Sequence, residues 1–353
     1  MKPDKLRVVV AEDSPTARRL LVEILRADPE IEVVGEARDG VEAVELTRRL
    51  RPHLVTMDIQ MPNLDGLEAT RRIMTEVPTP VVVVSTLVER DIQTSMAALR
   101  AGALAVLQKL VGPHAPDFET EARRLRDTVK AMAEVKVVRH WPPREPSPPP
   151  QPQATPARRV RASVLTIAAS TGGPAALHRI LSELPASFPL SILVVQHIAL
   201  GFARGLASWL DSVCPLEVKV AEDGEPLRPG VVYIAPDDRH LGLRASHQVE
   251  VSNAAPVGGF RPSGTFLFRS AGRVLGANVA AAVLTGMGQD GLDGLREIHE
   301  AGGWVMAQDE ATCVIYGMPA VAVAAGVADE VLPLERFSLR FRELAGLEPG
   351  PAD

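Results

Sequence analysis

The chain has few of the features that mark secreted or membrane-spanning proteins. It contains two cysteines, Cys214 and Cys313, which cannot form a disulfide framework and do not lie in a Cys-x-x-Cys spacing. No run of about 18 uncharged apolar residues occurs, so no transmembrane span is expected. Because Glu12 and Asp13 follow the three N-terminal valines after a single alanine, that end lacks a signal-peptide core. These absences predict a cytoplasmic protein without insertion into a membrane.

The chain also lacks an excess of basic residues. Its 38 lysines and arginines against 44 aspartates and glutamates give a net charge of −6, so no global attraction to nucleic acid is expected. Hydrophobic residues at 46% and charged residues at 23% are ordinary globular values, which excludes wholesale disorder. At roughly 150 residues per domain, a chain of 353 residues predicts two domains.

Proline, by contrast, is abundant and concentrated in one segment. Eight of the 30 prolines fall between Trp141 and Pro156. Such a stretch favours extended polyproline II over helix or central strand. We interpret it as a linker between two domains, with a docking site for an SH3-like partner as the alternative.

The first half alternates strand-like apolar runs with amphipathic helical segments. Its expected strands are Leu6 to Ala11, Ile31 to Ala37, Leu54 to Met57, Val81 to Ser85 and Ala103 to Gln108. Its expected helices begin near Pro15, Gly40, Gly66, Asp91 and Asp117. Five such repeats within about 135 residues predict a doubly wound parallel sheet.

The second half repeats this pattern with continuous apolar runs, which are typical of buried parallel strands. Its expected strands are Val164 to Ala169, Ser191 to Gln196, Val231 to Ala235 and Val279 to Leu284. The predicted fold class is therefore α/β, with two doubly wound parallel-sheet domains joined by a proline-rich linker.

Charged and polar residues follow several strands of the first half. Glu12 and Asp13 come after its first strand, Asp58 after the third, Ser85 ends the fourth, and Lys109 follows the fifth. Functional groups of open α/β sheets gather at these strand ends. Three converging carboxylates favour a hard cation such as Mg²⁺ among them. With a hydroxyl and an ammonium at the same rim, the set predicts a phosphoryl-transfer site in which an aspartate is the acceptor.

These residues lie in motifs that resemble response-regulator receiver domains. The motifs are Val-Val-Ala-Glu-Asp-Ser, Met-Asp-Ile-Gln-Met-Pro-Asn-Leu-Asp-Gly and Val-Val-Val-Val-Ser, within about residues 5 to 125. The resemblance implies a flavodoxin-like fold and Asp58 as the phosphoacceptor. It implies Mg²⁺ ligands from Glu12, Asp13, Asp58 and the main-chain oxygen of Gln60, and a phosphoryl-sensing pair of Ser85 and Lys109.

The first half departs from the receiver pattern near its lysine. Receivers usually have a proline directly after this lysine, where this chain has Leu110. They commonly have an aromatic residue three positions before it, where this chain has Val106. Phosphorylation is expected to survive these changes, whereas the way in which it signals to the second half is left open.

A serine follows the first strand of the second half, in Ser170-Thr171-Gly172-Gly173-Pro174. A hydroxyl at a strand tip facing a helix N-terminus gains from main-chain N–H groups and the helix dipole. The neighbouring strand ends at His197, a candidate general base, and a later glycine-rich loop carries Asp290, which would orient the imidazole. The alternatives are a phosphate-binding turn at Ser170, a structural role for His197, and Asp293 as the carboxylate.

Six ordered motifs of the second half resemble the catalytic domain of the CheB family, the chemotaxis protein-glutamate methylesterases. They are Ala-Ser-Thr-Gly-Gly-Pro, Val-Val-Gln-His, Tyr-Ile-Ala-Pro, Arg-Pro-Ser, Leu-Thr-Gly-Met-Gly-Gln-Asp-Gly and Gln-Asp-Glu-Ala-Thr with Tyr-Gly-Met-Pro, between about residues 163 and 335. The resemblance implies a Rossmann-like domain, a triad of Ser170, His197 and Asp290, and oxyanion donors near Thr171 and Met287.

The resemblance also implies an activity and its regulation. The enzyme would demethylate glutamate methyl esters on methyl-accepting chemoreceptors, release methanol, and in some members deamidate glutamine. A CheA-type histidine kinase would phosphorylate Asp58 and release the receiver from the active site, and the esterase domain would need no cofactor. The expected boundaries are a receiver domain at 1–125, a helical tail and linker at 126–161, and a methylesterase domain at 162–345.

Two departures and two alternatives stay open. Family members often have a proline two residues after the histidine, where this chain has His197-Ile198-Ala199, and the linker is longer than expected. A receiver-controlled hydrolase acting on another ester is one alternative, because a triad determines the reaction and not the protein substrate. A phosphorylation-controlled adaptor without turnover is the other.

Overall fold

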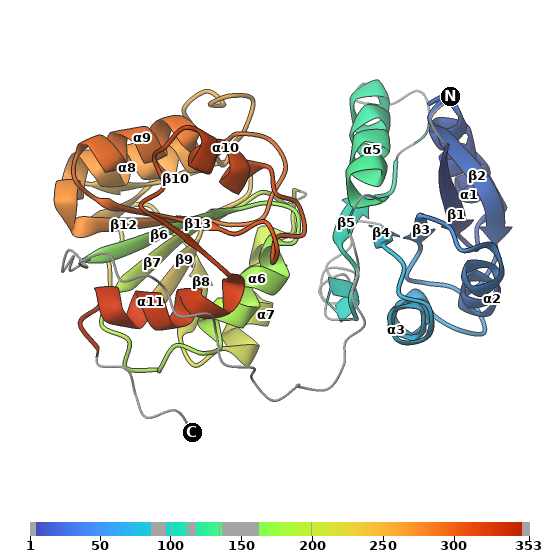
Figure 1. Ribbon diagram of the computed structural model, residues 1–353, viewed down its shortest axis with the longest axis horizontal. Helices are drawn as coiled ribbons and strands as arrows, with labels where there is room; N and C mark the ends of the chain where they lie inside the picture. The colour runs from blue at the N-terminus through green and yellow to red at the C-terminus, as the bar shows by residue number, and fades with distance from the viewer. Residues whose placement is uncertain are drawn as a thin grey trace.

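The computed structural model describes residues 5–85, 97–99, 101–110, 112, 118–133, 135, 162–198 and 200–347. Two α/β units occupy these ranges, each built on a parallel sheet (Figure 1). The expected linker between Trp141 and Pro156 and the expected helix start near Asp91 lie outside the described residues. None of the helices in the described ranges combines the length and apolar character that crossing a bilayer requires.

The first unit has a sheet of strand order β2-β1-β3-β4-β5, in which all neighbouring strands are parallel. The strands are β1 (Leu6–Ala11), β2 (Ile31–Ala37), β3 (Leu54–Met57), β4 (Val81–Ser85) and β5 (Ala105–Gln108). The helices are α1 (Pro15–Arg26), α2 (Gly40–Leu50), α3 (Gly66–Glu76) and α5 (Phe118–Ala133). The order reverses direction beside β1, and this places the ends of β1 and β3 next to each other.

Helix starts in the first unit follow from side-chain caps in the sequence. Ser14 accepts a hydrogen bond from the N–H of Ala17 ahead of α1, and Asp39 and Asp65 cap α2 and α3 in the same way. The apolar faces then cover both sides of the sheet. Helices α1 and α5 pack with alternate residues of β1, and α2 and α3 pack on the opposite face.

The second unit has a seven-stranded sheet of order β14-β13-β12-β6-β7-β9-β8, again parallel throughout. Its strands are β6 (Val164–Ala169), β7 (Ser191–Gln196), β8 (Glu217–Val220), β9 (Val231–Ile234), β12 (Val279–Val283), β13 (Trp304–Gln308) and β14 (Glu330–Leu332). A separate antiparallel hairpin pairs β10 (His240–Arg244) with β11 (Gln248–Ser252).

Helices cover both faces of this sheet (Figure 1). One face carries α6 (Gly173–Leu181), α7 (Ala203–Val213) and α11 (Phe337–Leu344). The other face carries α8 (Gly264–Leu275), α9 (Leu292–Glu300) and α10 (Met318–Ala324). Short 3₁₀ turns lie at Gly276–Asn278 and Leu334–Arg336. The central strands β6, β7 and β12 are buried on both faces, as their continuous apolar runs predict.

The predicted fold class is confirmed: both units are α/β with parallel sheets. Three strand bounds were too wide, because β5 begins at Ala105, β9 ends at Ile234 and β12 ends at Val283. Five strands of the second unit were not predicted, namely β8, β10, β11, β13 and β14. Of these, β8, β11 and β14 contain charged residues such as Glu217, Glu250 and Glu330, as expected for partly exposed strands.

Candidate functional site

Three strand ends of the second sheet bring the predicted triad residues together. Ser170 directly follows β6, His197 directly follows β7, and Asp290 lies in the loop after β12. Because β6 lies between β12 and β7, the three loops leave the same edge of the sheet side by side. The arrangement follows from sheet order, which the positions of these residues along the chain do not reveal.

The imidazole of His197 contacts the carboxylate of Asp290. Nε2 of His197 lies 2.9 Å from Oδ2 of Asp290. The hydroxyl of Ser263 donates to Oδ1 at 2.7 Å, and the main-chain N–H groups of Gly264 and Thr265 donate at 2.6 Å and 3.2 Å. Burial acts to raise the pKa of Asp290, but His197 and these donors outweigh it and lower that pKa to about 2. Asp290 is therefore an ionised carboxylate that orients the ring.

The other ring nitrogen of His197 points away from Asp290. Nδ1 is buried and has no hydrogen-bond partner in the part of the chain that the structure describes. Ser170 and His197 line the same cleft, although the hydroxyl of Ser170 is not hydrogen-bonded to the ring. Such contacts are often open without substrate and close in the substrate complex. The geometry suits Nδ1 as the atom that accepts the serine proton.

Ser170 lies at the start of helix α6. Gly172 has a φ of +79° and precedes the first turn, in which Pro174 stands. Thr171 and Met287, the predicted oxyanion residues, line the same cleft as Ser170, and the side chain of Met287 is exposed. The positive end of the α6 dipole and main-chain N–H groups at this turn favour negative charge next to the hydroxyl.

A buried threonine links the two loops that carry the oxyanion candidates. The hydroxyl of Thr285 donates to the main-chain oxygen of Thr171 at 2.9 Å. The N–H of Thr285 donates to the side-chain oxygen of Gln308 at 2.8 Å. Both Thr285 and Gln308 are buried, so the loop that carries Met287 is held in place by satisfied polar contacts.

Gln196, the third residue of the Val-Val-Gln-His motif, is a buried residue for which the motif predicts no role. Its Nε2 donates to the main-chain oxygen of Ser170 at 2.7 Å and to that of His197 at 2.9 Å. A Cβ at Gly173 would overlap its Oε1, so the glycine makes room for this amide. One side chain thereby ties the backbones of two triad residues together. The cue in the sequence is a polar amide at the end of the mostly apolar strand Ser191–Gln196, which does not by itself reveal these contacts.

The alternative carboxylate, Asp293, does not contact the predicted base. It lies 3.2 Å from Arg296 in the first turns of α9, and its side chain is 59% exposed. His240 is buried and stacks on Phe266, with Nε2 3.1 Å from the main-chain oxygen of Ala255. Neither residue forms a second acid–base pair.

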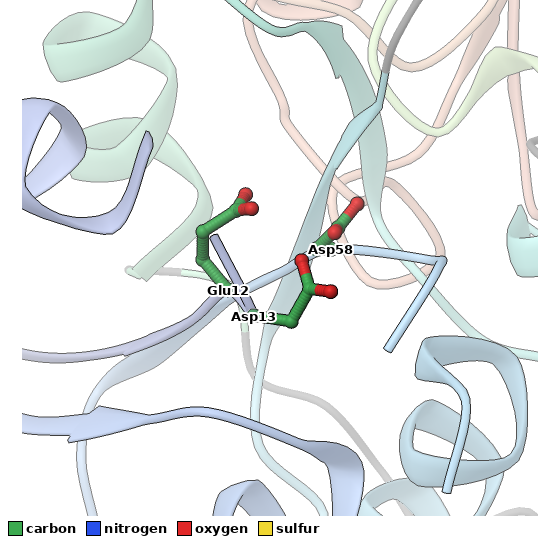
Figure 2. A group of neighbouring side chains, drawn as sticks. All are labelled: Glu12, Asp13 and Asp58. Carbon is green, nitrogen blue, oxygen red and sulfur yellow. The ribbon is translucent and has the colours of Figure 1, made fainter. Parts of the chain in front are cut away.

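Three carboxylates meet at the strand ends of the first sheet. Glu12, Asp13 and Asp58 each offer an oxygen within 4.8 Å of the others (Figure 2). Glu12 and Asp58 are buried, whereas Asp13 is exposed. Gln60, which is exposed, follows Asp58 by two residues in the loop between β3 and α3. Oxygen ligands of this kind suit a hard divalent cation, so the donor set fits the Mg²⁺ that the sequence predicts.

A lysine partly neutralises these carboxylates. Nζ of Lys109 lies 2.9 Å from Asp58 and 3.0 Å from Glu12. Burial raises the pKa of both carboxyl groups, the charge of Asp58 adds to the rise at Glu12, and Lys109 opposes it. Although burial lowers the pKa of Lys109, its pairing with both carboxylates raises that pKa overall. Ser85 is buried at the end of β4, and its main-chain oxygen accepts from the N–H of Lys109 at 2.8 Å.

A cleft of about 370 Å³ lies between the two units. Ser170, His197 and Phe260 line it on one side, and residues of β5 and α5, among them Arg124 and Asp127, line it on the other. Figure 1 shows β5 and α5 on the side of the first unit that faces the second. The predicted nucleophile therefore lies in a cleft that both units line.

Comparisons with known proteins agree with both resemblances. Residues 165–340 match the CheB methylesterase family, and residues 8–115 match the response regulator receiver domain. A protein-glutamate methylesterase/protein-glutamine glutaminase of Myxococcus xanthus is 69% identical, covering 98% of this chain and all of the relative. A second relative so named, from Anaeromyxobacter dehalogenans, is 56% identical over 93% of this chain and 95% of its own length.

A solved structure adds to this comparison. The CheB methylesterase catalytic domain of Thermotoga maritima is 42% identical and covers 52% of this chain and 100% of that domain, with a TM-score of 0.51. The sequence identity to full-length relatives extends through both units, so the two domains occur together in those proteins as they do here. The chain therefore belongs to the CheB family of methylesterases that carry a response-regulator receiver domain.

Proposed function

We propose that this chain is a protein-glutamate methylesterase and protein-glutamine glutaminase that acts on methyl-accepting chemoreceptors and is activated by phosphorylation of Asp58. The observation that carries the proposal is the 2.9 Å contact between His197 and Asp290 in the cleft that Ser170 lines. The names of full-length relatives supply the substrate class.

The reaction begins when Oγ of Ser170 attacks the γ-carbonyl carbon of a glutamate methyl ester. Nδ1 of His197 takes the hydroxyl proton, and Asp290 stabilises the resulting imidazolium. Collapse of the tetrahedral intermediate breaks the bond to the methoxy group, which takes the proton from His197 and leaves as methanol. Water then attacks the acyl-enzyme with His197 as base, which frees glutamate and restores Ser170. With glutamine as substrate, the same steps release ammonia.

Negative charge develops on the carbonyl oxygen in each tetrahedral intermediate. Main-chain N–H groups near Thr171 and Met287, together with the start of α6, are the proposed donors to this oxygen. Thr285 ties the Thr171 turn to the loop that precedes Met287. Preorganised donors of this kind are typically worth about 2.7–4 kcal/mol of transition-state stabilisation each.

In the first unit, Asp58 accepts a phosphoryl group from a CheA-type histidine kinase. Glu12, Asp13, Asp58 and the main-chain oxygen of Gln60 are the residues that would hold Mg²⁺, which when bound neutralises charge on the phosphoryl oxygens. Lys109 pairs with Asp58 and Glu12 before phosphorylation. Ser85 and Lys109 then contact the phosphoryl group and report its presence.

We further propose that the first unit limits access to the triad until Asp58 is phosphorylated. The cleft in front of Ser170 is lined on its far side by β5 and α5. Val106, which stands where receivers commonly have an aromatic residue, packs against the apolar core cluster of the second unit. An equilibrium between docked and released units is the physical form of this control, because phosphorylation can act only by favouring one state over the other.

The proposed boundaries are a receiver domain at 1–125, a helical tail and linker at 126–161, and a methylesterase domain at 162–345. The proposed site of action is the cytoplasm. We propose that the chain makes no direct contact with nucleic acid. We also propose that the esterase domain needs no cofactor.

The direct test is methanol release from receptor carrying radiolabelled methyl esters, comparing the full chain with Ser170→Ala. The proposal predicts release by the wild type and none by the variant. Equal release by both would contradict the triad. Absence of release by the wild type, with or without a phosphodonor and Mg²⁺, would favour an esterase for another substrate or a non-catalytic adaptor.

A further inference from the structure

Phe260 stacks on the imidazole of His197. The ring centroids are 4.5 Å apart and the ring planes differ by 13°. Phe260 is 36% exposed and lines the cleft that holds Ser170. Large apolar side chains in exposed positions lose the free energy of burial, so this placement in front of a predicted catalytic base points to a role other than core packing.

The ring of His197 needs a second restraint besides Asp290. The hydrogen bond at Nε2 positions one atom of the ring, but it does not determine the ring plane. The χ2 torsion of histidine has broad wells, so the side chain itself does not determine the plane either. A parallel phenyl ring at 4.5 Å does determine it, and it thereby aims Nδ1, the nitrogen that must accept the proton of Ser170.

The backbone at Phe260 is itself rigidly held. Val257 and Phe260 exchange two main-chain hydrogen bonds of 3.0 Å across a two-residue turn. That turn consists of Gly258 and Gly259, with φ of +60° and +87°, a conformation that only glycine adopts readily at both positions. On the other side of Phe260, Arg261 donates to Asp238 at 2.8 Å.

The same short segment also holds the carboxylate. Ser263, three residues after Phe260, donates to Asp290, as do the next two main-chain N–H groups. Residues 260–265 therefore contact both the ring face of His197 and the carboxylate that binds its edge. We propose that Phe260 is a positioning residue that holds the catalytic imidazole in the plane required for proton transfer from Ser170.

The chain contains a matched control for this proposal. His240 and Phe266 stack with the same centroid separation of 4.5 Å and the same interplanar angle of 13°. Neither residue lines the cleft that holds Ser170. Replacing Phe266 removes an equivalent stacked ring from the same domain without touching the triad.

The experiment compares the full chain with Phe260→Leu, Phe260→Tyr and Phe266→Leu, using methylated receptor with saturating phosphodonor and Mg²⁺. Misplaced catalytic groups cost about 10- to 100-fold in rate, so Phe260→Leu is expected to lower kcat by at least about tenfold with KM changed less than about threefold. Phe260→Tyr, which keeps a flat aromatic ring, is expected to restore kcat to within about threefold of the wild type. Phe266→Leu is expected to leave kcat unchanged.

Three results would overturn the proposal. An unchanged kcat in Phe260→Leu would do so, as would a change confined to KM, which would make Phe260 a substrate contact only. An equal fall in Phe260→Leu and Phe260→Tyr would show that ring stacking is not the cause. Should Phe260→Leu fail to fold, as judged by its thermal midpoint, Phe260→Met takes its place with the same expectations.

The inference rests on the proposed triad, and the two can fail separately. If Ser170→Ala released methanol as fast as the wild type does, the triad would be overturned and, with it, the role of Phe260. Loss of release in Ser170→Ala together with an unchanged kcat in Phe260→Leu would overturn the role of Phe260 alone.

Discussion

Nε2 of His197 lies 2.9 Å from Oδ2 of Asp290, across 93 residues of sequence. Because Asp290 is ionised, Nε2 must carry the proton and donate it to the carboxylate. In the neutral imidazole, Nδ1 is then the nitrogen without a proton, and it is the atom left to accept the proton of Ser170. The contact thus assigns a separate role to each ring nitrogen.

Replacing Asp290 with asparagine is expected to reverse this assignment. The amide can hold the wrong tautomer of His197 and cannot stabilise the imidazolium. The expected result is a fall in kcat of about a thousandfold or more, measured as methanol release at neutral pH. A fall of less than about tenfold would contradict the role given to Asp290.

The lowered pKa of Asp290 also predicts how the free energy of unfolding depends on pH. Its pKa is lowered from 3.8 to about 2 in the folded protein, so the folded state favours the carboxylate form. The stabilisation that comes from this pKa difference is fully present above the unfolded pKa and is lost as the pH falls through the range from 3.8 to 2. At pH 3, about 1 kcal/mol of it should already be lost. Urea unfolding of the second unit should therefore show a wild-type advantage over Asp290→Asn that shrinks by about this amount between pH 6 and pH 3. An advantage independent of pH would contradict the account.

Gln196 is expected to matter for turnover rather than for binding. Gln196→Met keeps the length of the side chain but removes both hydrogen bonds to the carbonyls of Ser170 and His197. We expect kcat to fall about 10- to 100-fold with KM little changed. Ser191→Ala is the matched control, because it removes a partly buried hydrogen bond of 2.8 Å at the opposite end of the same strand. Equal effects of the two variants on kcat would indicate a general loss of packing.

The carboxylates of the first unit predict a dependence on Mg²⁺. Lys109→Met leaves Glu12 and Asp58 buried without their cation, and breaking a buried pair in this way costs about 3–5 kcal/mol. The free energy of unfolding of the wild type and of Lys109→Met, measured once with a chelator and once with Mg²⁺, tests this expectation. Mg²⁺ should stabilise Lys109→Met more than the wild type, and Asp13→Asn should weaken the Mg²⁺ effect in both backgrounds. No stabilisation by Mg²⁺ in any of these proteins would argue against a cation site.

Much of the fold follows from local patterns in the sequence. Strands β1, β2, β3, β4, β6 and β7 have the predicted bounds, because continuous apolar runs ending in polar residues mark buried parallel strands. Helix starts at Pro15, Gly40 and Gly66 follow from the caps before them. Strands with charged residues, such as β8 and β14, lack a continuous apolar run because they are only partly buried, so this pattern does not predict them.

Site residues could be predicted from the sequence where a single residue with a reactive side chain stands at the end of a strand. Ser170, His197 and Asp290 could be proposed in this way, and the sheet order then places them together. Gln196 and Phe260 could not, because their contacts depend on where separate loops meet in space. The position of β5 and α5 across the cleft likewise depends on packing between units, which no motif encodes.

The central claim is that the state of Asp58 controls the reaction at Ser170. The most direct test measures methanol release from methylated receptor with and without a small-molecule phosphodonor plus Mg²⁺, for the wild type, Asp58→Asn and Ser170→Ala. The account predicts no release by Ser170→Ala, stimulation of the wild type by the phosphodonor, and no stimulation of Asp58→Asn. Equal stimulation of the wild type and Asp58→Asn would contradict it.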